Sequence, residues 1–103
     1  MTEIERMTEA VFQAIDELND ILPPERQLHK SLDTVLYGSS GRLDSLELVN
    51  LIVAAEQNIE DEFGVPITLA DERAMSQRNS PFRSVATLVT YISSLLGEQL
   101  KVA

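Results

Sequence analysis

The chain has 103 residues, which is enough for one domain with a single hydrophobic core. Its hydrophobic content of 44%, with three phenylalanines, two tyrosines and no tryptophan, indicates a core of leucine, isoleucine and valine and favours a small helical bundle. The net charge of -9 disfavours binding to nucleic acid and to anionic membranes, and the lack of cysteine excludes disulfides, thiolate catalysis and cysteine-ligated metal sites.

The first residues carry no export signal. Met1 to Glu5 is acidic and lacks the positive region and long apolar core of a secretory signal, and no segment is apolar over the length needed to span a bilayer. We therefore predict a cytoplasmic protein without stable membrane insertion. The strong negative charge also favours a monomer.

A first helix is predicted from about 3 to 20. Thr2 and Glu5 have the spacing of a capping box, and Pro23 and Pro24 prevent continuation of the helix. Apolar residues recur at steps of three and four, as expected for one buried face: Ile4, Met7, Val11, Ile15 and Leu18.

A long connection should follow, up to Gly41, with a flexible turn at Gly38 to Gly41. A loop of this length in a small domain usually has a binding role or a functional restraint. Its lone His29 has no cysteine or second histidine with which to form a metal site, so we expect an exposed residue. Five apolar residues are expected to anchor the connection to the core: Leu28, Leu32, Val35, Leu36 and Tyr37.

A second helix is predicted from about 45 to 62. Asp44 is a favourable N-cap, and Glu47 three residues later completes a capping box. Ser45 falls at the first helical position, where its hydroxyl should face solvent. The free amides and positive dipole end of the helix would favour a phosphate attached there. Gly64 and Pro66 should close this helix.

Two apolar strips run along the second helix. The core strip occupies about 120° of the helix circumference and contains Leu48, Leu51, Ile52, Ala55, Ile59 and Phe63. The second strip is mixed with acidic residues and is a candidate docking strip, here defined as Leu46, Glu47, Val49, Val53, Glu56 and Glu60. No lysine or arginine lies between Leu43 and Glu72, so a partner should present basic residues there. Simple core packing and a solvated acidic face are the alternatives for this strip.

The C-terminal part should contain a short helix near 69 to 75 and a final helix from about 84 to 97. The final helix carries a buried face of Val85, Leu88, Val89, Ile92, Leu95 and Leu96. Residues 1 to 103 are therefore predicted to form a single all-α domain, a small four-helix bundle with a long loop between the first and second helices.

Several motifs in order resemble the acyl carrier protein family over roughly residues 33 to 96. They are Asp44-Ser45-Leu46, then Val49, Leu51, Ile52 and Glu56, then Phe63-Gly64-Val65-Pro66-Ile67, and finally Phe82-Arg83-Ser84-Val85 with Leu88 and Tyr91-Ile92. In that family the serine carries a 4'-phosphopantetheine arm. The resemblance therefore implies attachment of this group to Ser45, with Asp44 as the helix cap beside it.

The resemblance also implies partners and a role. The partners would be a phosphopantetheinyl transferase and the acyl-loading and acyl-transferring enzymes, with basic docking patches. The chain would be a carrier and not an enzyme, holding an acyl group as a thioester for fatty acid, lipid or polyketide-type synthesis. No base near Ser45 completes a Ser-His-Asp set, which agrees with a carrier.

Two departures from the family pattern point to a specialised member. The spacing from Ser45 to the end of the second helix is longer by about four residues, or about 6 Å of helix, and the connection from Ile67 to Phe82 is also longer. Two alternatives stay open. One is a peptidyl or aminoacyl carrier, which Asp44 disfavours because those carriers commonly have histidine before the serine. The other is an unmodified acidic helical interaction module, in which Ser45 is an ordinary helix serine.

Overall fold

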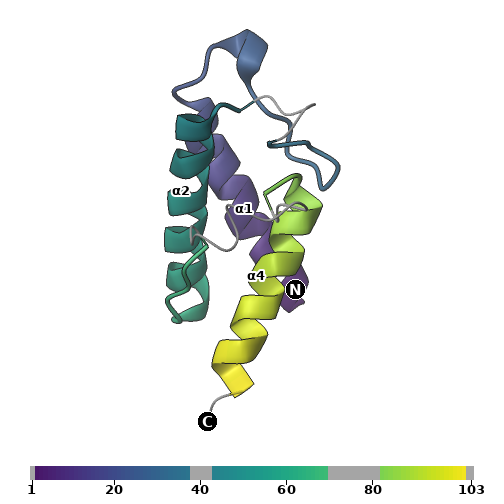
Figure 1. Ribbon diagram of the computed structural model, residues 1–103, viewed down its shortest axis with the longest axis vertical. Helices are drawn as coiled ribbons and strands as arrows, with labels where there is room; N and C mark the ends of the chain where they lie inside the picture. Colours follow the sequence, from purple (N-terminus) through teal and green to yellow (C-terminus); the bar gives the residue numbers. More distant parts are fainter. Residues whose placement is uncertain (1, 38–42, 70–81, 102–103) are drawn as a thin grey trace.

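The computed structural model of the protein describes residues 2–37, 43–69 and 82–101 (Figure 1). These residues contain the α-helices α1 (Glu3–Asn19), α2 (Ser45–Phe63) and α4 (Val85–Lys101), together with a short 3-10 helix, η1 (Pro24–Arg26). The described part is therefore all-α, as predicted, and its only strand-like feature is an isolated antiparallel bridge between Val35 and Ser84.

Two predicted features lie outside the described residues. Most of the short helix expected near 69 to 75 falls within residues 70–81, and the turn at 38 to 41 falls within residues 38–42. The count of four helices and the long loop therefore stay predictions. Among the residues that the structure does describe, no helix has both the length and the apolar character needed to cross a membrane.

The first helix begins at the predicted capping box. The Thr2 hydroxyl accepts a hydrogen bond from the Glu5 amide at 3.1 Å, and the Glu5 carboxylate accepts from the Thr2 amide at 3.5 Å. The helix ends at Asn19, before the two prolines of the connection. The apolar spacing predicted most of its buried face, but Ile4 is exposed because it lies in the first turn at the end of the helix, and two alanines are added. The buried residues are Met7, Ala10, Val11, Ala14, Ile15 and Leu18.

The second helix also ends as predicted. Gly64 is its C-cap, with a φ of 70°, and its amide donates to the Glu60 carbonyl oxygen at 2.8 Å. A positive φ costs most residues free energy because Cβ approaches the following carbonyl oxygen, whereas glycine has no Cβ. Glycine at this position therefore fixes the end of α2 and the direction of the chain that follows.

The three α-helices share one core. Helix α1 packs against both α2 and α4, and it runs antiparallel to α2, with the connection between them crossing one end of the molecule (Figure 1). All but one of the predicted core strip residues of α2 are buried, and Phe63 is half-buried. Residues outside the α-helices complete the core: Leu22, Leu28, Leu36, Leu43, Leu69 and Phe82.

The connection after α1 is anchored by fewer side chains than expected. Leu28 and Leu36 are buried, as predicted, but Leu32, Val35 and Tyr37 are exposed. This segment is held instead by its backbone at the start of α4. The amides of Val85 and Ala86 donate to the carbonyl oxygens of Thr34 and Leu32, both at 3.0 Å. These carbonyl groups satisfy amides that a helix N-terminus cannot pair within itself.

Two glycine substitutions should shift stability in opposite directions. A Cβ at Gly64 or at Gly97 would meet no atom within 4 Å, so only backbone conformation differs. Gly64→Ala should lower the free energy of unfolding by about 1 kcal/mol, because alanine disfavours the left-handed region. Gly97→Ala, within α4, should raise it by about 0.5 to 1 kcal/mol through helix propensity. Urea unfolding measures both, and equal effects of the same sign would contradict this account of Gly64.

Candidate functional site

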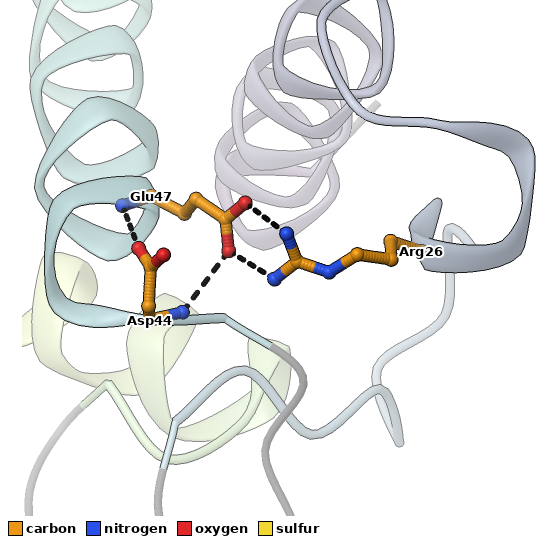
Figure 2. Close-up of polar contacts among 3 residues, drawn as sticks. All are labelled: Arg26, Asp44 and Glu47. Atoms are coloured by element: carbon orange, nitrogen blue, oxygen red, sulfur yellow. Dashed lines mark hydrogen bonds and ion pairs between the residues drawn. The ribbon is translucent and has the colours of Figure 1, made fainter.

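The predicted capping box forms at the start of α2 (Figure 2). Asp44 has an extended backbone, and its carboxylate accepts a hydrogen bond from the Glu47 amide at 2.8 Å. The Glu47 carboxylate accepts in return from the Asp44 amide at 3.0 Å. The first intrahelical bond then runs from the Leu48 amide to the Asp44 carbonyl oxygen, at 2.9 Å. Hydrogen bonds therefore fix Asp44 directly before Ser45 and Glu47 two residues after it.

Ser45 is the first residue of α2, and its side chain lies outside the described part of the structure. Its two neighbours are exposed: Asp44 faces solvent, and 70% of Leu46 is accessible. Because Asp44 takes the Glu47 amide, the amides of Ser45 and Leu46 are those of the first turn without an acceptor inside the helix. Such amides, with the positive helix end, form an environment that suits an attached phosphate.

A bidentate ion pair adds a contact that the sequence did not predict. Arg26 of η1 reaches the Glu47 carboxylate with both terminal nitrogens, with Nη1 at 2.7 Å from Oε2 and Nη2 bonded to Oε1 (Figure 2). Only 14% of the Glu47 side chain is exposed. The bond from Arg26, together with that from the Asp44 amide, holds the pKa of Glu47 below its ordinary value. The same contact raises the pKa of Arg26.

The sequence alone did not predict the ion pair between Arg26 and Glu47. The two residues are 21 positions apart, and Arg26 lies in a segment without helical periodicity, so no local pattern links them. The one available signal was charge. Arg26 is a basic residue in an acidic chain, two residues after the Pro-Pro pair that was expected to end the first helix.

A second set of contacts holds the residue that precedes the capping box. Leu43, directly before the capping box, is buried, and its amide donates to the Leu36 carbonyl oxygen at 3.2 Å. The Leu36 amide in turn donates to the Arg83 carbonyl oxygen at 2.8 Å, next to the start of α4. The start of α2 is thus tied to η1 by side chains and to α4 through the backbone.

The apolar members of the candidate docking strip are exposed. The accessible fractions are 70% for Leu46, 37% for Val49 and 44% for Val53, and Glu60 is also exposed. These residues therefore lie outside the core, as expected for a contact surface, while a docking role stays a prediction.

Two acidic members of the strip are engaged within the chain. Glu47 is the ion-pair and capping residue just described, and the half-buried Glu56 carboxylate accepts from the Leu69 amide at 2.7 Å. The sequence analysis placed both on the docking strip and predicted the capping contact of Glu47, but it predicted neither the ion pair with Arg26 nor the contact of Glu56 with Leu69. Of the acidic residues assigned to it, Glu60 is the one whose side chain is fully on the surface.

No group of three or more histidine, cysteine or acidic residues in residues 2–37, 43–69 and 82–101 is placed to hold a metal ion. His29 is exposed in the connection, as predicted. Comparison of the chain with family models, with curated proteins and with solved structures gives no match.

Acidification should weaken the contact between η1 and α2. The pKa of Glu47 is lower in the folded protein than in the unfolded chain. Ionised Glu47 therefore stabilises the folded protein at a pH above the ordinary glutamate pKa, and this stabilisation is lost as the pH falls through the folded-state pKa. An NMR titration of the Glu47 carboxyl carbon should give a low pKa in the wild type and a value closer to ordinary in Arg26→Ala. Lys30→Ala, which removes a more exposed ion pair with Asp16, should leave the Glu47 pKa unchanged. An unchanged pKa in Arg26→Ala would contradict the pairing.

Proposed function

We propose that the protein is a carrier that bears a 4'-phosphopantetheine group on Ser45 and holds an acyl group on its thiol. The observation that supports this most is the start of α2. There an Asp-Ser-Leu sequence lies in an exposed helix terminus fixed by a capping box and followed by a partly exposed apolar strip. The four-helix bundle of such carriers agrees with the all-α class of the described residues.

The residues around Ser45 suit the chemistry of attachment. In the reaction, the serine oxygen bonds to the phosphorus next to the pantetheine part of coenzyme A, and the pyrophosphate bond breaks. Adenosine bisphosphate leaves, and the serine proton passes to a base of the transferase. The amides of Ser45 and Leu46 and the positive end of α2 would stabilise the negative phosphodiester. The bound group would supply the thiol that a chain without cysteine lacks.

The surface beside Ser45 suits brief contacts with several enzymes. A tethered thioester is presented at high effective concentration to each enzyme that docks, which a freely diffusing substrate is not. Docking must also be reversible. Exposed Val49 and Val53 provide a small apolar contact, and the negative charge around them speeds association with basic patches. The partners would be a phosphopantetheinyl transferase and acyl-loading and acyl-transferring enzymes in the cytoplasm.

Replacement of Ser45 tests the attachment point. The purified chain is incubated with coenzyme A and a phosphopantetheinyl transferase, and intact mass is recorded over time. The wild type should gain one phosphopantetheine, and Ser45→Ala should gain none while keeping the helical circular dichroism of the wild type. Ser39→Ala and Ser40→Ala are matched controls and should be modified normally. Modification of Ser45→Ala would show that the site is wrong. A wild type that is never modified would instead favour an unmodified interaction module.

Charge reversal tests the docking strip. Glu60→Lys places a positive charge on the exposed part of α2, whereas Glu9→Lys makes the same change on the exposed face of α1. If basic enzymes dock on α2, Glu60→Lys should raise the KM for modification about threefold to tenfold, mainly at low salt, because association is slowed. Glu9→Lys should have a smaller effect. Equal increases would show that net charge, and not a local surface, determines recognition.

A further inference from the structure

The contact between Arg26 and Glu47 lies two residues along α2 from the proposed attachment point, Ser45. Most exposed ion pairs contribute little, because both side chains lose freedom and water screens the charges. This pair differs in two respects. It is bidentate, a geometry that fixes both the distance and the orientation of the two groups. Its carboxylate is largely covered and already belongs to the capping box.

The three hydrogen bonds to Glu47 act on the same carboxylate. Arg26 supplies two of them and the Asp44 amide supplies the third, so the guanidinium holds the oxygen that accepts from Asp44 (Figure 2). Without Arg26, the Glu47 side chain could rotate into solvent and leave the Asp44 amide without this acceptor. Asp44 immediately precedes Ser45, so a change in its backbone would move the nucleophile.

We propose that Arg26 is a positioning residue for the modification of Ser45, acting through the Glu47 carboxylate and the Asp44 backbone. This inference rests on the function proposed above and adds a residue from outside α2 to its site. The proposal also changes the role expected of Glu47 in docking. Glu47 belongs to the internal support of the site, and a basic partner could reach its carboxylate only by displacing Arg26.

A double-mutant cycle distinguishes this role from direct docking. The chains are the wild type, Arg26→Ala, Glu47→Gln and the double variant, with Arg26→Lys as the conservative change. Glutamine at 47 keeps an oxygen for the Asp44 amide but removes the charge that Arg26 binds. Lys30→Ala is the matched control, since it removes one positive charge from the same connection and a more exposed pair. The readouts are kcat and KM for the modification of each chain by a transferase with coenzyme A.

A positioning role predicts a change in kcat rather than KM. Arg26→Ala should lower kcat about tenfold, the scale expected when a reacting group is misplaced, with KM within about twofold of the wild type. The double variant should be no slower than the slower single variant, because both changes break one contact. Arg26→Lys should recover part of the rate, since lysine restores the charge without the bidentate geometry. Lys30→Ala should resemble the wild type.

Four results would overturn the inference. Wild-type kcat in Arg26→Ala would show that positioning does not need the guanidinium. Effects that multiply in the double variant, or that appear in KM alone, would mean that the two residues act separately, as in direct contact with the transferase. Circular dichroism melting excludes general unfolding as the cause of a low rate.

If the wild type itself is never modified, the proposed function fails, and the positioning role fails with it. Normal modification of the wild type with an unaffected Arg26→Ala rate refutes the positioning role alone.

Discussion

The carboxylate of Glu47 is the point where separate parts of the chain meet. It accepts hydrogen bonds from the Arg26 guanidinium of η1 and from the Asp44 amide directly before α2. The backbone amide of Glu47 in turn donates to the Asp44 carboxylate. A helix N-terminus must find acceptors for its first amides. Here Asp44 provides the acceptor for the Glu47 amide, and the Glu47 carboxylate, which accepts from the Asp44 amide, also binds Arg26 of the connection after α1. The direction in which α2 leaves the connection, and with it the position of Ser45, depends on this carboxylate.

The opposite end of α2 is held by a second arginine. Arg6 of α1 donates through Nε to the Glu62 carboxylate at 2.7 Å and through Nη2 to the Glu62 carbonyl oxygen at 2.9 Å, and it lies over the Phe63 ring. A cation at this end also suits the negative end of the helix dipole. With eight basic residues against seventeen acidic ones, the chain places these two arginines at the two ends of α2. The middle of α2 keeps its uncompensated charge and its exposed valines.

The sequence predicted the helices better than it predicted the contacts between them. The starts and ends of α1 and α2 could be predicted because Thr2, Asp44 and Gly64 act locally, through bonds to residues three or four positions away. The core strip of α2 followed from periodicity for the same reason. The final helix begins within one residue of its predicted start but continues to Lys101, four residues past the predicted end, since no proline follows Gly97 to stop it.

Contacts between distant residues could not be predicted in this way. Arg26 and Glu47, and likewise Glu56 and the Leu69 amide, are brought together only by the packing of the core. Leu32, Val35 and Tyr37 were expected to be buried because they are apolar, yet their segment is held by backbone bonds to α4 and leaves them exposed. For the candidate site, the capping box was therefore predictable, whereas the support that Arg26 gives it was not.

In the living cell, Ser45 is proposed to carry a covalently attached phosphopantetheine. Intact mass spectrometry of the protein, purified at its natural abundance from the cells that make it, tests this most directly. We expect a population heavier by the mass of phosphopantetheine, with fragmentation that assigns the added mass to Ser45. A population of entirely unmodified chains, or an added mass on another residue, would contradict it.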